Sequence, residues 1–521
     1  MGVLVLVTWV AVAGWHVRRE YFAPAMTRLA EATLTLDPGT HFYAIRMAGR
    51  TIGTSSSRLD TVPEGFRLDD LTQLDLVAMG AAGQAVVRTS ATLSTTLRLL
   101  TFDFALQSAA GSFEATGSVE GDSLLTVRIQ SDGAPPEEIR FRVAEAPLVS
   151  GVLPIRLAKG GDLRVGRTVR FPVFDPSTVS NRVVEVEVLE RGTVMIADSS
   201  YLDPATGRWK MARERAVAGW RISERYGGVQ VESWIDDDGR ILGSTSPMGF
   251  ALERTEFELA RQARDDTREA AALAAGRGGT PGGAAGDLSG DLVFSTAIAS
   301  NMALDAAAGY DRLRFRLSGV TLDGFDLDGG RQALEGDVLT VTPEDWARLT
   351  PGYSLPYPRM DLREALEPEP LVQSGDPRIR AAAEAMVRGG GRLPNDPRVV
   401  AERLTRGVHG LLRKEVVFAL PSALSVLESR RGDCTEHTVL YVALARSLGL
   451  PARTAVGLVY LDGAFFYHAW PEVWLGAWVA VDPTFGDVPA GAAHLRFVTG
   501  TLAQQVEIAR LIGTLGIEVL E

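Results

Sequence analysis

The stretch Gly432-Asp-Cys434-Thr-Glu-His437 decides the fold of the C-terminal part of this 521-residue chain, because it holds the only cysteine. Gly432 and Asp433 signal a turn, and residues 435–448 follow with apolar positions at helical spacing. Cys434 is therefore expected at the mouth of a helix, where unpaired backbone N–H groups and the helix dipole favour a negative charge. The thiolate is the nucleophilic form of cysteine, so this position favours a reactive role. A structural cysteine would more naturally lie on the apolar face, one turn further along.

Two strand-like segments downstream of this helix supply the other groups that a thiol nucleophile needs. Phe465-Phe-Tyr-His468-Ala-Trp-Pro-Glu-Val-Trp474 lies between two glycine turns, and Trp478-Val-Ala-Val-Asp482-Pro-Thr484 follows. Strands joined by such turns are expected to be antiparallel, so His468 and Asp482 fall on neighbouring strands. The imidazole can then take the thiol proton while the carboxylate orients the ring. We predict that Cys434, His468 and Asp482 form a catalytic triad.

Each of these residues also has a structural interpretation. A lone cysteine is often a small buried apolar residue, and Asp before Pro often forms a turn. The chain has six histidines, and we expect only His468 to lie in such a strand pair after the cysteine. His437 follows on the same helix as Cys434 and is expected to support the site or to face solvent. A metal at Cys434 and His437 is discounted because no other soft ligand is present, so no metal and no cofactor is expected.

Further blocks extend this pattern along the chain. With Ala443-Leu-Ala-Arg-Ser-Leu-Gly-Leu-Pro-Ala-Arg453 and Gly457, the segments above resemble the transglutaminase-like superfamily, in order, across residues 375–500. The resemblance implies a papain-like α+β core with Cys434 as nucleophile, His468 as general acid and base, and Asp482 as the orienting acid. It places no oxyanion-hole side chain, so the backbone N–H of Cys434 is the expected donor. The residues expected to line or support the substrate pocket are Trp470, Trp474, Trp478 and Glu436.

The region before this core has a different pattern. Residues 30–260 contain segments in which apolar and polar residues broadly alternate, among them Thr40–Met47, Leu124–Gln130 and Val229–Ile235. Alternation predicts strands with one packed and one solvated face, as in antiparallel sheets. We therefore predict an α+β protein in which an antiparallel β domain, a curved sheet or partial barrel, precedes the papain-like core.

Two short motifs in the β region resemble the curved-sheet domains of periplasmic lipoprotein carriers. They are Tyr43-Ala-Ile-Arg-Met-Ala-Gly-Arg-Thr-Ile-Gly53 and Gly239-Arg-Ile-Leu-Gly-Ser244. The resemblance implies a sheet that could cup a hydrophobic ligand or polymer. A docking scaffold for the catalytic part is the alternative, because a fold of this kind does not fix its function.

Composition changes mark the domain boundaries. A polar helix is expected over Glu253–Ala275, followed by a Gly/Ala-rich stretch at Gly276–Gly286 that cannot bury a face and therefore predicts a flexible linker. Asp376-Pro377 and Asp396-Pro397 are typical helix starts. The predicted divisions are an export signal or membrane anchor (1–25), the β domain (30–260), helix and linker (261–290), a β-rich lead-in (291–375), the catalytic core (376–500) and a C-terminal tail (501–521).

The net charge limits the kinds of partner that the protein can bind, and the N-terminal segment indicates its location in the cell. A formal charge of −12 argues against a nucleic-acid surface, because phosphate neutralisation needs clustered Lys and Arg. Residues 3–15 form an apolar run of signal-peptide length, although Arg18 and Arg19 follow it rather than precede it. We predict an extracytoplasmic bacterial protein, periplasmic or anchored to the membrane through this segment; a buried N-terminal element is the alternative.

Three functions are compatible with these residues. The first is a cysteine protease or amidase that hydrolyses peptide or amide bonds of a peptide or protein substrate through a thioester. The second is a protein transamidase, in which an amine replaces water. The third is a non-catalytic envelope scaffold or binding protein that retains the triad. An intact Cys434, His468 and Asp482 argues for the enzymatic alternatives.

Overall fold

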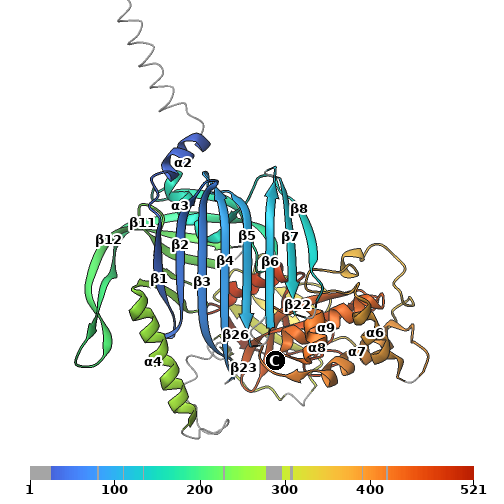
Figure 1. Cartoon of the computed structure of the whole chain (residues 1–521). Helices are drawn as coiled ribbons and strands as arrows, with labels where there is room; N and C mark the ends of the chain where they lie inside the picture. Colours follow the sequence, from blue (N-terminus) through green and yellow to red (C-terminus); the bar gives the residue numbers. More distant parts are fainter. Residues whose placement is uncertain are drawn as a thin grey trace, which may run out of the picture.

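A computed structural model describes residues 25–78, 81–109, 111–121, 123–132, 134–226, 229–276, 296–305, 309–389, 391–417 and 420–520. Most of the predicted export segment and nearly all of the Gly/Ala-rich linker lie outside these residues. In the described part, no helix has both the length and the apolar character needed to cross a membrane. Two bodies of structure are visible, a large sheet and a smaller mixed part beside one end of it (Figure 1).

The N-terminal part is a 15-stranded sheet in the order β8-β7-β6-β5-β4-β3-β2-β1-β15-β14-β13-β12-β11-β10-β9. All its neighbouring strands are antiparallel except β9 and β10. The strands are β1 (Gly39–Met47), β2 (Arg50–Val62), β3 (Gly65–Ala78), β4 (Ala81–Ser94), β5 (Leu99–Ser108), β6 (Gly111–Glu120), β7 (Leu124–Ser131), β8 (Glu137–Arg142), β9 (Leu148–Val149), β10 (Thr168–Asp175), β11 (Ser180–Asp203), β12 (Arg208–Tyr226), β13 (Val229–Ile235), β14 (Ile241–Thr245) and β15 (Phe250–Thr255).

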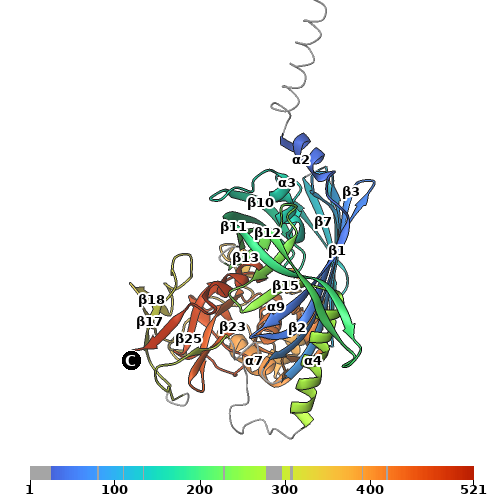
Figure 2. The same ribbon diagram turned by 90° about the vertical axis from the view of Figure 1, so that its left-hand side faces the viewer.

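The sheet curves around its own apolar core. Its alternating strands place residues such as Leu68, Phe102, Leu125 and Val186 on one buried face, and the view in Figure 2 shows β10–β13 bending away from β1–β7. The strand order runs from one edge strand, β8, to the other, β9, as in a curved open sheet. The predicted antiparallel β domain, a curved sheet, is thus confirmed.

Short helices flank the sheet: α2 (Ala25–Thr33), η1 (Ser150–Val152), α3 (Leu153–Lys159) and α4 (Phe257–Gly276). The prediction of a helix from Glu253 was wrong at its start, because residues 250–255 form β15 and pair with both β1 and β14. Pairing on two sides satisfies their backbone groups in a way that a helical first turn would not. The helix α4 then packs along β1 and β2, and Arg264 Nη2 donates to Asp75 Oδ1 at 3.1 Å.

The C-terminal part combines helices with a second sheet. The helices are α6 (Pro377–Arg388), α7 (Pro397–Leu411), α8 (Ala423–Ser429) and α9 (Cys434–Ser447); the strands are β16 (Ile298–Ala299), β22 (Ala452–Leu461), β23 (Ala464–Trp474), β24 (Trp478–Ala480) and β25 (His494–Thr499). The order is β16-β23-β22-β25, with β24 paired to β23. Asp376 and Asp396 cap α6 and α7 as their sequence pattern predicts.

The helix α9 is the centre of this part. An apolar face was expected, but every residue from Glu436 to Ser447 is buried, because α6, α7 and α8 cover it on the sides that the sheet leaves open. A small sheet flanks this core in the order β18-β19-β17-β26. Its strands are β17 (Leu313–Ser318), β18 (Gln332–Glu335), β19 (Val338–Val341) and β26 (Gly516–Val519), so the segment predicted as a tail pairs with the lead-in.

The remaining short elements connect these layers. They are η3 (Arg363–Ala365), β20 (Arg413–Lys414), β21 (Arg431–Gly432), α10 (Leu502–Gln505) and η4 (Val506–Leu511). The parallel pair β20 and β21 matters most for the site, because β21 leads directly into α9.

Candidate active site

Cys434 is the first residue of α9 and is half-buried. Asp433 caps the helix: its Oδ1 accepts from the N–H of Thr435 at 2.9 Å, and its own N–H donates to Glu436 Oε2 at 3.0 Å. This reciprocal capping box fixes the direction in which the chain enters the helix. Gly432 is required here, since a Cβ at that position would lie 2.2 Å from the Cβ of Glu436. The geometry places the thiol where backbone N–H groups are unpaired.

His468 and Asp482 come together from β23 and from the turn after β24. His468 Nε2 lies 2.7 Å from Asp482 Oδ2, and both side chains are buried. Asp482 Oδ1 accepts from the backbone N–H of Thr484 at 2.7 Å and of Phe485 at 3.3 Å. Because a carboxylate only accepts, the proton of this pair lies on His468 Nε2, which leaves Nδ1 for the thiol.

Aromatic rings hold the His468 imidazole in its plane. The ring of Phe485 stacks on the imidazole with 5.0 Å between the ring centroids, and the ring of Trp470 stacks on it at 5.9 Å. Both rings lie within 25° of parallel to the imidazole. Trp470 is fully buried. The sequence assigned Trp470 to the pocket or its support, and the structure places it against the imidazole. No sequence motif marked Phe485 as a site residue, apart from its position three residues after Asp482.

The electrostatics of the three groups favour an ionised pair. Burial by itself would lower the pKa of His468, but the carboxylate of Asp482 and the side chain of Cys434 raise this pKa to about 10. Burial would likewise raise the pKa of Asp482, yet His468 and His494 hold it well below its ordinary value. The imidazole is therefore protonated at neutral pH beside an ionised Asp482.

His494 also contacts Asp482, and the sequence reasoning missed it. Its Nε2 lies 2.9 Å from Asp482 Oδ2, the same oxygen that His468 contacts. The expectation that only His468 lies in the relevant sheet was wrong, because His494 is on β25 and pairs with Val459 of β22. A signal was present in the apolar segment after Ala490, which has strand character, but no motif marked its first residue.

Three buried side chains at the site are of types that can also bind a metal ion. His468, Asp482 and His494 each offer one ligand atom within 4.8 Å of the others. Both imidazole nitrogens already donate to one oxygen of Asp482. Hydrogen bonds therefore account for the arrangement of these three buried side chains.

The other predicted support residues lie in different places. Glu436 caps α9, and its pKa is raised well above the ordinary value by burial, then by the charge of Asp433. Trp474 and Trp478 pack edge to face across the β23–β24 pair, 5.5 Å apart. Six residues of extended strand, roughly 20 Å, separate Trp474 from His468. His437 is fully buried, and its Nδ1 contacts the carbonyl oxygen of Asp433 at 2.6 Å.

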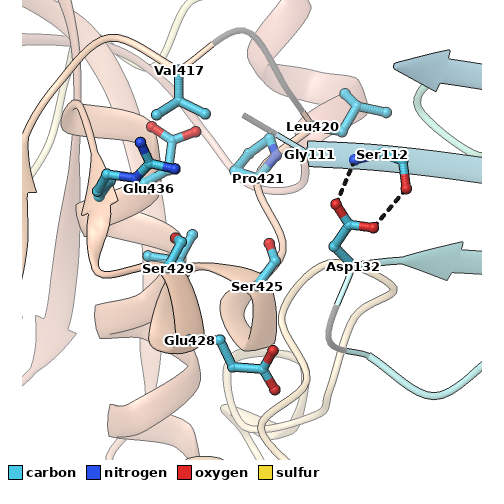
Figure 3. A pocket seen from close by; sticks show the side chains of 12 residues that line it. Gly111, Ser112, Asp132, Val417, Leu420, Pro421, Ser425, Glu428, Ser429 and Glu436 are labelled. Atoms are coloured by element: carbon cyan, nitrogen blue, oxygen red, sulfur yellow. Dashed lines mark hydrogen bonds between the residues drawn. The ribbon is translucent and has the colours of Figure 1, made fainter. Parts of the chain in front are cut away.

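A groove of about 320 Å³ separates the large sheet from α8 and α9. Figure 3 shows Ser112 and Asp132 of the sheet facing Ser425, Ser429 and Glu436. At 100° per helical residue, Glu436 lies about 200° around α9 from the first residue of the helix. The groove therefore lies on the opposite side of α9 from Cys434, which is not among its lining residues.

Comparison with known families identifies the C-terminal part. A family model described as the transglutaminase-like superfamily matches residues 406–483. These residues include Cys434, His468 and Asp482. The predicted resemblance is thus confirmed for this segment, and the C-terminal part has a general cysteine-enzyme fold. No curated protein matches the chain.

Three solved structures are similar to parts of the chain. A candidate cysteine protease from Cytophaga hutchinsonii is 15% identical with a TM-score of 0.27, covering 40% of this chain and 83% of that one. A β-barrel-like protein of unknown function from Brucella abortus is 12% identical, TM-score 0.31, covering 42% and 94%. A Pseudomonas aeruginosa protein is 10% identical, TM-score 0.22, covering 37% and 90%. These low scores support no conclusion about fold, and the resemblance to lipoprotein carriers stays a prediction.

Proposed function

The chain carries a transglutaminase-like domain, and on that premise we propose that it is a cysteine-nucleophile acyl-transfer enzyme that hydrolyses peptide or amide bonds through a thioester. One observation carries the proposal. A half-buried thiol at a helix N-terminus interacts electrostatically with the His468 imidazole, and Nε2 of that imidazole is held 2.7 Å from a buried carboxylate. This is the nucleophile, base and orienting group that acyl transfer by a thiol requires.

The first half of the reaction forms the thioester. The Cys434 thiolate attacks the substrate carbonyl carbon, and the electron pair of the C=O bond moves to oxygen. Among the described residues the backbone N–H of Cys434 has no acceptor, so it is free to donate to that oxyanion. When the intermediate collapses, the C–N bond breaks and the amine leaves with the proton that His468 gives it.

The second half regenerates the enzyme. His468, now neutral, takes a proton from water, and the hydroxide attacks the thioester carbonyl. The C–S bond breaks, the acid product leaves, and the thiolate and imidazolium are restored. Asp482 keeps its charge throughout and stabilises the imidazolium in each half. A primary amine in place of water would give transamidation by the same steps.

Alkylation tests the nucleophile without any knowledge of the substrate. Because Cys434 is the only cysteine, iodoacetamide uptake reports on this thiol alone. We expect alkylation of the folded protein at pH 6 to be about tenfold faster or more than that of the same chain unfolded in urea. A folded protein that reacts no faster than the unfolded one would refute the proposal.

Substrate turnover then separates water from an amine as acceptor. Proteomic comparison of cells carrying the wild type or Cys434→Ala is expected to show new peptide termini that depend on the thiol. The same comparison with a fluorescent primary amine added would show incorporated dye if transamidation is the reaction. An extracytoplasmic location is part of the proposal and rests on residues 1–25; fractionation of an epitope-tagged chain tests it.

A further inference from the structure

We propose that His494 is a positioning residue of the catalytic centre, which orients Asp482 and thereby His468. The inference rests on the proposed function and extends it, because it makes the working unit a chain of four side chains, Cys434–His468–Asp482–His494. The observation that carries it is geometric. Both imidazole Nε2 atoms lie within hydrogen-bond distance of one carboxylate oxygen, at 2.7 and 2.9 Å.

The hydrogen bonds of Asp482 leave it one orientation. Its Oδ1 accepts from two backbone N–H groups of the following turn, and its Oδ2 accepts from the two histidines. The carboxylate is ionised, so His494 must carry its proton on Nε2. Without that donor, Oδ2 would be held by His468 alone, and the pair could rotate together away from the thiol.

The charges around His494 keep it neutral. Burial lowers the pKa of His494 most, and the charges of His468 and Arg331 lower it further, against the opposing effect of Asp482. Asp487 also lies near His494, and the charge of His494 lowers the pKa of Asp487 against the larger effect of burial, which raises it. Among the described residues, His494 Nδ1 has no hydrogen-bond partner. His494 thus acts as a neutral donor and adds no second positive charge beside the imidazolium.

The lead-in segment holds His494 in place. Arg331, just before β18, donates through Nη2 to the carbonyl oxygens of Ala490 and Gly491 at 2.6 and 2.7 Å. The side chain of Gln332 bonds to both the N–H and the carbonyl oxygen of Arg496, two residues beyond His494. The start of β25 is therefore fixed on both sides of the histidine, by residues that lie outside the segment matched by the family model.

Close packing against β22 fixes the strand further. A Cβ at Gly457 would lie 1.8 Å from the carbonyl oxygen of Leu495, so only glycine lets β25 approach β22 this closely. Gly457 also pairs with His468 on its other side. One glycine thus allows the two histidine-bearing strands to flank β22 at the separation that Asp482 bridges.

The test is the pH dependence of Cys434 alkylation by iodoacetamide in the full chain. The wild type is expected to show an upper inflection where His468 loses its proton. In His494→Leu, Asp482 Oδ2 serves one donor only and binds the imidazolium more strongly. The upper inflection should therefore move to higher pH, and kcat toward any peptide substrate should fall by about 10- to 100-fold, the size of one hydrogen bond to a charged group.

Two controls separate positioning from stability. His494→Gln can place an amide N–H near Asp482 and should return the upper inflection toward the wild-type pH. His41→Leu removes a half-buried histidine of the large sheet and should leave the upper inflection unchanged. An upper inflection that stays put in His494→Leu would overturn the inference. A wild type that alkylates like an unfolded thiol would instead refute the proposed function.

A second measurement holds even if His494→Leu fails to fold. Proton NMR of the wild type with ¹⁵N-labelled histidine should show two strongly downfield Nε2–H resonances, one for each imidazole that donates to Asp482. Cys434→Ala should retain both. A single such resonance, with His494 protonated on Nδ1, would overturn the inference.

Discussion

Glu185 and Glu472 are each held between two arginines, and their surroundings differ. In the large sheet, Glu185 contacts Arg170 and Arg225 at 2.9 and 2.7 Å. In the catalytic part, Glu472 contacts Arg453 and Arg496 at 2.6 and 3.0 Å. The side chain of Glu185 is 26% exposed and that of Glu472 is 1% exposed. The same arrangement is solvated in one region and desolvated in the other.

The difference shows how each region is stabilised. The sheet depends on one apolar face, and the ion pairs of Glu185 lie on the solvated side where water competes with them. The catalytic part places His468, Asp482, Glu472 and His494 inside, where each charge needs its partner. Substitutions of polar residues should therefore be mild in the sheet and severe in the core.

The largest expected effect is the loss of the nucleophile. Cys434→Ala should lower kcat by at least about 10³-fold, because the other triad members cannot form the thioester without it. The free energy of unfolding should change little, since the thiol is half-buried. Turnover of the substrate found by proteomics, together with urea denaturation, checks both. Full activity in Cys434→Ala would favour the scaffold interpretation.

The next effect tests the buried carboxylate of the comparison. Glu472→Gln takes away the buried charge partner of the Arg496 guanidinium and leaves it the partly exposed Asp326, so the free energy of unfolding should fall by about 3 kcal/mol. Equilibrium urea denaturation followed by tryptophan fluorescence measures this change. A loss below about 1 kcal/mol would show that the core tolerates an unpaired charge as well as the sheet does.

The stabilising contribution of the His468–Asp482 pair should persist over a wide pH range. The pKa of His468 is raised from 6.5 to about 10, so its stabilising contribution is complete below pH 6.5 and is lost as pH rises through about 10. The pKa of Asp482 is lowered, so its contribution is present above 3.8 and is lost as pH falls below that value. The alkaline limb of kcat/KM should lie near pH 10, and Asp482→Asn should move it toward neutrality. A wild-type limb near 6.5 would contradict the ionised pair.

The smallest expected effect is on the solvated carboxylate. Glu185→Gln should change the free energy of unfolding by less than about 1 kcal/mol, because both arginines remain hydrated. The same urea titration used for Glu472→Gln gives the matched value. Raising the salt concentration should reduce the effect of Glu185→Gln more than that of Glu472→Gln. Equal losses in the two variants would remove the distinction between the regions.

Much of the architecture could be predicted from local patterns. Val229–Ile235 was expected as a strand and forms β13, and Asp376-Pro377 begins α6 as expected. These elements are set by alternation and capping, which act over a few residues. The start of α4 could not be predicted in this way, because residues 250–255 gain partners from β1, some 200 residues earlier.

The residues of the site also differ in whether a local sequence pattern predicts them. Cys434, His468 and Asp482 carry a motif with fixed spacing, and the structure brings His468 and Asp482 within 2.7 Å. His494 and Arg331 carry none, because their roles depend on how β25 packs beside β22 and the lead-in. Trp474 and Trp478 resemble site residues in sequence, but an extended strand carries them away from His468. Motif spacing in the sequence predicts the proposed catalytic residues more readily than the residues that position those side chains.

The pairing of β26 with β17 has a consequence for how the protein folds during synthesis. Residues 516–519 form β26, and β17, their partner, belongs to the same small sheet as β18, the strand next to Arg331. Synthesis runs from the N-terminus, so the large sheet can form while the ribosome is still translating the core. The small sheet that supports His494 is complete only after β26 has been translated. The arrangement of His468, Asp482 and His494 therefore depends on residues 516–519, although these residues come after all three side chains in the sequence.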